Sequence, residues 1–154
     1  MRVAVGADHA GFALKQQVLE WLKQSGHDVV DVGALEFDPV DDYPDSAVAV
    51  AESVRDGGAE RGIIVCGSGI GAGMAANKIR GIRAGVCHDT YSAHQGVEHD
   101  DMNVLCLGGR IIGVEPAKEI VNAFLSARFI DEEKYRRRLG KVNALDERRK
   151  AKGS

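Results

Sequence analysis

Five short apolar runs recur along this chain of 154 residues, and stretches with helical spacing separate several of them. Runs of this length, bounded by glycine and polar residues, are typical of strands buried in a parallel sheet. The runs are Val3–Val5, Val29–Val32, Ile63–Cys66, Ala84–Cys87 and Val104–Leu107. Strands that alternate with helices predict right-handed crossovers on both faces of the sheet. We therefore expect an α/β protein, a Rossmann-like three-layer α/β/α sandwich with a five-stranded parallel sheet.

Three stretches have the spacing of apolar residues that one face of an amphipathic helix requires. These faces are Leu14, Val18, Trp21 and Leu22; Ala47, Val50, Ala51 and Val54; and Ala117, Ile120, Val121, Phe124 and Leu125. Pro116 fits the first turn of the third helix. The length suits one domain, which we place at residues 1–148, with residues 149–154 as a frayed polar tail.

The segment from Asp131 onward predicts a last helix that begins with acidic residues and has one basic face. Lys134, Arg137, Arg138 and Lys141 fall at i, i+3, i+4 and i+7. A neighbouring, mainly apolar stripe consists of Tyr135, Leu139, Val142 and either Leu145 or Asp146. The basic face is either a solvated surface or an anion site. An apolar stripe that cannot pack on its own domain would pack on another subunit.

Composition excludes several classes of function. The hydrophobic content is 44% without a long apolar stretch, so we expect neither a membrane span nor a signal peptide, and a cytoplasmic protein. A net charge of −3 argues against extended nucleic-acid binding but leaves small anionic ligands possible. Cys66, Cys87 and Cys106 lie at or near the ends of apolar runs, which suits reduced thiols. No His or Cys spacing indicates a metal site.

Ligands of open parallel sheets bind beyond the carboxyl ends of the strands. Applied to this chain, the rule predicts which side chains share that edge. They are Asp8 and His9 after the first run, Cys66 to Gly71 after the third, His88 and Asp89 after the fourth, and Gly108-Gly109-Arg110 after the fifth. Asp8 alone could equally be a helix cap.

The segment Cys66-Gly67-Ser68-Gly69-Ile70-Gly71 places a thiol at the end of a strand and follows it with a glycine-rich turn. Glycines let the backbone turn sharply and expose its N–H groups, and a helix predicted at residues 72–78 directs its positive end to the same place. The spacing matches neither GxGxxG nor GxxxxGK[ST]. A structural turn with a buried cysteine is the alternative. Otherwise, these groups suit proton transfer next to the carbonyl of a phosphorylated substrate.

Several motifs together resemble the ribose-5-phosphate isomerase B family. They are Gly6-Ala7-Asp8-His9-Ala10-Gly11-Phe12, Asp42-Tyr43-Pro44, Cys66-Gly67-Ser68-Gly69-Ile70-Gly71, Ala75-Ala76-Asn77-Lys78, Gly81-Ile82-Arg83-Ala84, Tyr91-Ser92-Ala93 and His99 through Asn103. The resemblance extends over residues 1 to about 148. It implies an aldose–ketose isomerase that interconverts ribose 5-phosphate and ribulose 5-phosphate without metal or cofactor, as a homodimer or a dimer of dimers. Its sister group comprises galactose-6-phosphate isomerase subunits.

The resemblance also implies roles for individual residues. Cys66 would be the base that moves a proton between C1 and C2, and His99 would open the sugar ring. Ser68 and the amides of Gly67, Gly69, Ile70 and Gly71 would hold the enediolate. The family has a cysteine form and a glutamate form, and Ala72 at the glutamate position indicates the cysteine form.

The remaining substrate contacts implied by the resemblance come from both ends of the chain. Asp8 and His9 would contact sugar hydroxyls, and Arg110, Lys134 and Arg138 would contact phosphate. Three positions depart from the family pattern: Asp100 replaces the usual asparagine, Lys134 the usual arginine, and Tyr135 a frequent histidine. An anion at position 100 and a point charge at position 134 alter the recognition of an anionic ligand.

His99 precedes the last strand, so it begins at the edge of the sheet opposite Cys66. A strand of five residues spans roughly 17 Å, which predicts that His99 serves a neighbouring subunit and that active sites are shared. Three alternatives stay open. They are an isomerase of another aldose phosphate (allose or galactose 6-phosphate, or a tetrose 4-phosphate), a flavodoxin-like nucleotide- or flavin-binding module with the same order of elements, and a catalytically silent subunit.

Overall fold

The computed structural model describes residues 1–152, which contain five strands and six helices. The strands are β1 (Arg2–Ala7), β2 (Asp28–Gly33), β3 (Arg61–Cys66), β4 (Ala84–Val86) and β5 (Val104–Gly108). All strand pairs are parallel, and the order in the sheet is β2-β1-β3-β5-β4. Each predicted apolar run is therefore confirmed as a strand of one parallel sheet.

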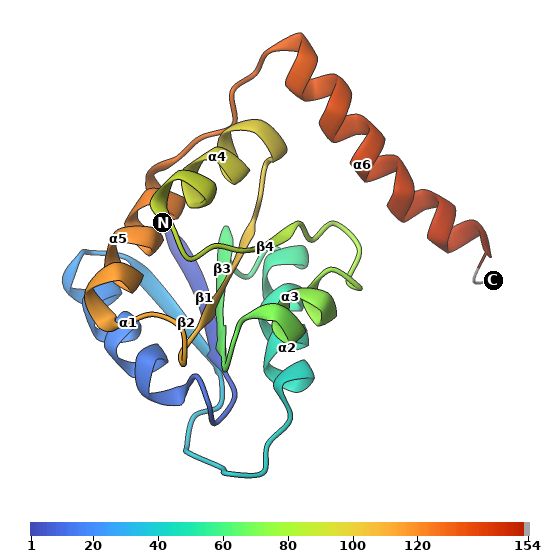
Figure 1. Ribbon diagram of the computed structural model, residues 1–154. Helices are drawn as coiled ribbons and strands as arrows, with labels where there is room; N and C mark the ends of the chain where they lie inside the picture. Colours follow the sequence, from blue (N-terminus) through green and yellow to red (C-terminus); the bar gives the residue numbers. More distant parts are fainter. Residues whose placement is uncertain (153–154) are drawn as a thin grey trace.

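The helices are α1 (Phe12–Gln24), α2 (Tyr43–Arg55), α3 (Ile70–Ala76), α4 (Thr90–Asp100), α5 (Val114–Ser126) and α6 (Glu133–Lys152). Helices α1, α4 and α5 cover one face of the sheet, and α2 and α3 cover the other (Figure 1). Neighbouring strand residues point to opposite faces, so Ile63 packs in the core with Phe124, and Ile64 packs in the core with Val50. The predicted three-layer α/β/α sandwich is confirmed.

The position of β5 between β3 and β4 is informative about the alternative functions. Flavodoxin-like proteins have the strand order 2-1-3-4-5. The chain therefore alternates strands and helices along the sequence as a flavodoxin-like module does, but it differs from such a module in the order of the strands in the sheet. The chain crosses from β3 to the edge strand β4 and then returns to fill the gap with β5.

Two boundaries and one helix differ from the predictions. Helix α4 was not predicted, because its buried face consists only of Ala93 and Val97; it begins where the Asp89 carboxylate accepts the Ser92 N–H at 2.6 Å. Helix α3 begins at Ile70, two residues before the predicted start. Helix α6 continues to Lys152, so much of the predicted frayed tail is helical, and residues 153–154 of that tail lie outside the described residues.

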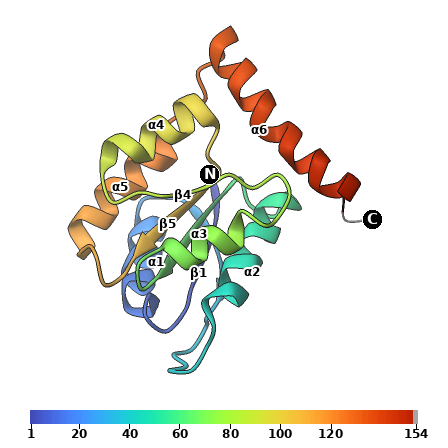
Figure 2. The same cartoon turned by 45° about the vertical axis from the view of Figure 1, so that its right-hand side comes forward.

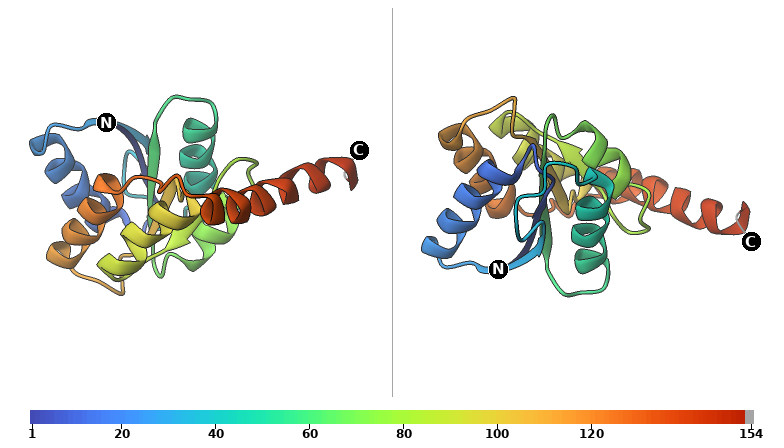
Figure 3. Two further views of the ribbon diagram at one scale, coloured as in Figure 1. Left: turned by 90° about the horizontal axis from the view of Figure 1, so that it is seen from above. Right: turned by 90° about the horizontal axis from the view of Figure 1, so that it is seen from below.

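Helix α6 leaves the sandwich and extends away from it (Figures 2 and 3). Near its start, the Tyr135 side chain is buried and its ring stacks on His99 of α4 with centroids 4.3 Å apart. Farther along, Val142 and Leu145 are 47% and 53% exposed. The apolar stripe of α6 is thus only partly covered by its own chain. Among the described residues, no helix has the length and apolarity to cross a bilayer.

Candidate active site

A cavity of about 350 Å³ lies beyond the carboxyl ends of β1 and β3. From β1 the chain crosses to β2 at the edge of the sheet and then returns past β1 to β3, with α1 and α2 on opposite faces, which opens a crevice at this point. The cavity is lined by Asp8, Tyr43, Cys66, Gly67, Ser68, Gly71, Arg110 and Ile111. The structure therefore brings together the predicted thiol, hydroxyl, carboxylate and guanidinium groups from three different strand ends.

Cys66 ends β3 with its side chain almost completely buried. The Gly69 N–H donates to Cys66 Sγ at 3.1 Å, and a donor in this position stabilises negative charge on sulfur. Gly69 has φ +82°, a left-handed conformation that a side chain disfavours. The glycine-rich turn thus directs an N–H group at the thiol. The next N–H, that of Ile70, donates to Ser68 Oγ at 3.3 Å.

The other two cysteines have a different environment. Burial raises the pKa of the Cys87 thiol to about 11, and deeper burial also raises the pKa of Cys106. Both thiols therefore stay protonated near neutral pH. Of the three cysteines, Cys66 is the one that lines the cavity.

The strand ends around the cavity are held close together by the backbone. A Cβ atom at Gly11 would lie 2.1 Å from the carbonyl oxygen of Val65, so only glycine fits where α1 approaches β3. The Gly109 N–H donates to the Cys66 carbonyl at 2.7 Å, and the Arg110 N–H donates to the Gly67 carbonyl at 3.1 Å. The turn after β5 is therefore fixed on the turn after β3, which places Arg110 at the cavity.

Asp8 and His9 follow β1. The Asp8 carboxylate is buried and accepts the Gly11 N–H at 3.0 Å, so it supports the turn into α1 and also lines the cavity. His9 is not among the residues that line the cavity. Its Nδ1 lies 2.7 Å from Asp41 Oδ1, and this hydrogen bond is the main cause of a raised pKa of His9.

Four of the predicted site residues lie elsewhere in the chain. His99, Asp100, Lys134 and Arg138 belong to the end of α4 and the start of α6, at the edge of the sheet where β5 begins. Strands β3 and β5 pair from Gly62–Val104 to Cys66–Gly108, so their full length separates this edge from the thiol. The structure does not bring these residues into the Cys66 cavity of the same chain.

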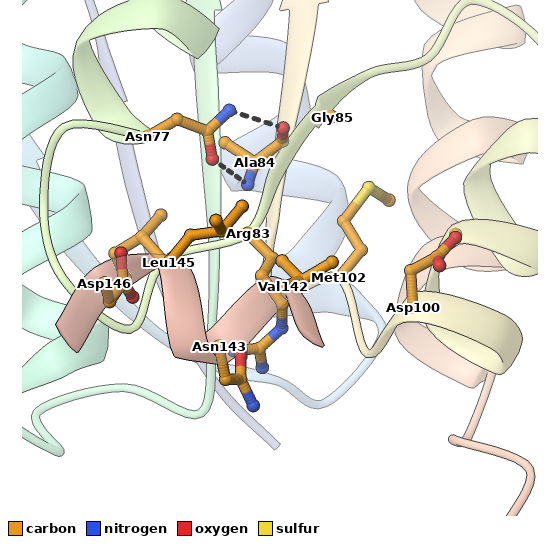
Figure 4. Close-up of a pocket in the computed structure, with 12 residues that line it drawn as sticks. Asn77, Arg83, Ala84, Gly85, Asp100, Met102, Val142, Asn143, Leu145 and Asp146 are labelled. Atoms are coloured by element: carbon orange, nitrogen blue, oxygen red, sulfur yellow. Dashed lines mark hydrogen bonds between the residues drawn. The ribbon is translucent and has the colours of Figure 1, made fainter. Parts of the chain in front are cut away.

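A second cavity, of about 520 Å³, lies at this opposite edge. Asp100 and Met102 line it on one side, and Val142, Leu145 and Asp146 of α6 line it on another (Figure 4). Asp146 also accepts the Gly81 N–H at 2.8 Å, which ties α6 to the loop before β4.

The basic residues of α6 differ in how they are paired. Lys134 Nζ lies 3.1 Å from Glu132 Oε2, which raises the pKa of Lys134. Arg137 forms an ion pair with Glu133. Arg138 is exposed, and no ion pair is recorded for it among residues 1–148. An anion could therefore bind the Arg138 guanidinium without displacing a carboxylate.

Sequence reasoning missed two side chains of the cavity. Tyr43 begins α2, and its ring covers Gly71 so closely that a Cβ there would lie 2.6 Å from it. Ile111 directly follows Arg110. Tyr43 starts the helix that follows β2, and Ile111 lies in the turn that follows β5. The carboxyl-edge rule, extended to the starts of the following helices and turns, would therefore have included both.

Comparisons with known proteins place the chain among sugar-phosphate enzymes. A profile of the Ribose/Galactose Isomerase family matches residues 3–142. Ribose-5-phosphate isomerase B of Escherichia coli (strain K12) is 40% identical over 148 residues, which cover 96% of this chain and 98% of that protein. D-erythrulose-4-phosphate isomerase of Pectobacterium atrosepticum is 44% identical over 132 residues, covering 84% and 85%. The structure of ribose-5-phosphate isomerase B of Clostridium thermocellum matches with a TM-score of 0.92 at 40% identity, covering 96% and 99%.

Proposed function

The chain belongs to the Ribose/Galactose Isomerase family and is an aldose–ketose isomerase, and we propose that it interconverts ribose 5-phosphate and ribulose 5-phosphate. We assign this activity to residues 1–148 as one domain, working in the cytoplasm without a metal or cofactor. The observation that carries the proposal is the Cys66 thiol, which lines the cavity with the Gly69 N–H 3.1 Å from its sulfur.

In the proposed reaction, the Cys66 thiolate removes the proton from C2 of the open-chain aldose. The electron pair of the broken C–H bond forms the C1–C2 double bond, and negative charge develops on O1, which gives a cis-enediolate. The proton of O2 then passes to O1, the thiol returns its proton to C1, and the ketose carbonyl forms at C2. Ser68 and the amides of the glycine-rich turn stabilise the negative charge that develops on oxygen.

The ring-opening step is assigned to His99 of a neighbouring subunit. His99 and Asp100 lie at the opposite edge of the sheet from Cys66 of their own chain, and the partly exposed stripe of α6 is suited to cover a second copy. In a homodimer or dimer of dimers, Lys134 and Arg138 would reach the phosphate of the same shared site. Arg110 would contact that phosphate from the chain that supplies Cys66.

A tetrose 4-phosphate is the second candidate substrate, supported by the 44% identity to D-erythrulose-4-phosphate isomerase. The two substrates differ in one step. The O4 atom of an aldotetrose 4-phosphate is esterified, so this sugar cannot close a five-membered ring and needs no ring opening. Replacement of His99 should therefore slow turnover of ribose 5-phosphate much more than turnover of erythrose 4-phosphate.

The test combines a substrate panel with replacement of the base. Ribose 5-phosphate, allose 6-phosphate, galactose 6-phosphate and erythrose 4-phosphate are assayed with EDTA for wild type, Cys66→Ser and the control Cys87→Ala. We expect Cys66→Ser to lower kcat by about 10²-fold or more, whereas Cys87→Ala loses stability and keeps kcat. Near-normal turnover by folded Cys66→Ser would remove the thiol from the mechanism. A higher kcat/KM for erythrose 4-phosphate would favour the tetrose substrate.

A further inference from the structure

One carboxylate connects the turn after β1 with the loop between β2 and α2. Asp41 Oδ1 accepts the main-chain N–H of His9 at 2.8 Å and lies 2.7 Å from His9 Nδ1. An ionised carboxylate can only accept hydrogen bonds, so Nδ1 is the nitrogen that carries the proton. A single oxygen of Asp41 thus fixes both the backbone and the ring of His9.

The same loop is held against the start of α1 at a second point. The ring of Phe37 packs edge-on against the ring of Phe12, with centroids 5.9 Å apart. The position of Asp41 therefore does not depend on the His9 contact alone. This second contact makes it possible to remove the charge of Asp41 without releasing the loop.

The electrostatic environment of His9 favours its charged form. The charged groups that act on its ring are Asp41, from the β2–α2 loop, and Asp8, from its own turn. Both are negative, and the hydrogen bond from Asp41 is the largest cause of the raised pKa of His9. The other ring nitrogen, Nε2, has no hydrogen-bond partner recorded among residues 1–148, and the side chain is 33% exposed.

We propose that Asp41 is a positioning residue that holds His9 as an oriented imidazolium, whose Nε2–H donates to an oxygen of the bound sugar phosphate. This rests on the proposed function, because the hydrogen bond from Nε2 requires a sugar phosphate bound at the Cys66 cavity. His9 directly follows Asp8, which lines the Cys66 cavity. With Nδ1 committed to Asp41, the proton on Nε2 is the one available to substrate, and a cationic donor forms a stronger hydrogen bond than a neutral one.

The experiment has a readout that does not depend on activity. The ring of His9 is titrated by NMR in the free protein, with its signal assigned by its loss in His9→Gln. Asp41→Asn keeps an oxygen that can accept both hydrogen bonds and removes the charge, so the titration midpoint should fall. Asp38→Asn is the matched control, since Asp38 lies in the same loop and its side-chain carboxylate accepts the Val40 N–H at 3.0 Å. This substitution should leave the midpoint unchanged.

The second readout is KM for ribose 5-phosphate against pH. At an alkaline pH chosen between the midpoints measured for wild type and for Asp41→Asn, the substitution should raise KM about tenfold, as expected when a charge-assisted hydrogen bond to substrate is weakened. At pH 6, where an ordinary imidazole is largely protonated, the increase should be less than about twofold. In the His9→Gln background the effect of Asp41→Asn on KM should disappear at both pH values, because the two residues act through one ring.

The outcomes separate this inference from the proposed function. An unchanged His9 midpoint in Asp41→Asn would overturn the inference even in an active isomerase. A lowered midpoint with unchanged KM at that alkaline pH, or an equal loss at both pH values, would also overturn it, because Asp41 would then not act through the charge of His9. Absence of isomerase activity in wild type would refute the proposed function while leaving the NMR result to stand.

Discussion

Replacing Asp31 by asparagine tests the buried ion pair that joins α1 to β2. The side chain of Lys15 is 0% exposed, although it ends in an ammonium group. Its Nζ donates to Asp31 Oδ1 at 3.0 Å and Oδ2 at 3.1 Å, and also to the Ala34 carbonyl. Asp31 is 28% exposed. The two partners therefore differ in how well water could replace a lost contact.

This difference sets the expected magnitudes. Asp31→Asn leaves an ammonium group that water cannot reach, and removing one partner of a buried pair costs about 3–5 kcal/mol. For a chain of this length, that corresponds to a decrease in Tm of roughly 6–20 °C. Lys15→Met fills a similar volume and leaves a carboxylate that is partly hydrated, so it should cost less.

The measurement is the free energy of unfolding in urea of wild type and both variants. The control is Lys23→Met, at an exposed lysine of the same helix, and its free energy of unfolding should stay within about 0.5 kcal/mol of wild type. The double variant should unfold close to Lys15→Met, since without the ammonium the asparagine has no buried charge to leave unpaired. If Lys15→Met proves more destabilising than Asp31→Asn, the reasoning from unequal burial is refuted.

Two further predictions concern the proposed shared site. Arg138→Ala should raise KM for phosphorylated sugars about tenfold and hardly change KM for the same sugars without phosphate. The control Arg137→Ala should change neither KM, because the guanidinium of Arg137 is already paired with Glu133. Equal effects of Arg138→Ala on both sugar types would show that the basic face is only a solvated surface. Cys66→Ser and His99→Asn dimers should each be nearly inactive, and refolding them together at equal ratio should restore about a quarter of wild-type activity by random assortment; no recovery would place both residues in one chain's site.

The sequence was most informative where burial is complete. Ile63, Val65 and Leu105 belong to continuous apolar runs because both faces of a central parallel strand are covered, and the carboxyl-edge rule then located Cys66 and Asp8 together. Helix α4 escaped prediction because Ala93 and Val97 give a weak apolar pattern.

Contacts made by irregular segments also could not be predicted from the sequence. Asp41 lies in a loop without periodicity, and nothing in its neighbourhood along the chain indicates that it meets His9, 32 residues away. The partner of His99 was closer to being predictable, because Gln95 precedes it by four residues on α4 and its amide Nε2 lies 2.7 Å from His99 Nδ1. The direction of α6 could not be predicted either, because its own chain covers the apolar stripe only in part.

The strand order has a consequence for synthesis on the ribosome. Strands β2, β1 and β3 can pair as soon as they emerge, but β4 pairs only with β5, which is made later. The roughly 20 residues between the ends of these two strands take about 1–4 s to translate. During that interval one edge of β3, which contains the apolar residues Ile63 and Val65, is unpaired, and β4 has no strand to pair with. Nascent chains that stall before residue 104 should therefore be the ones most dependent on chaperones.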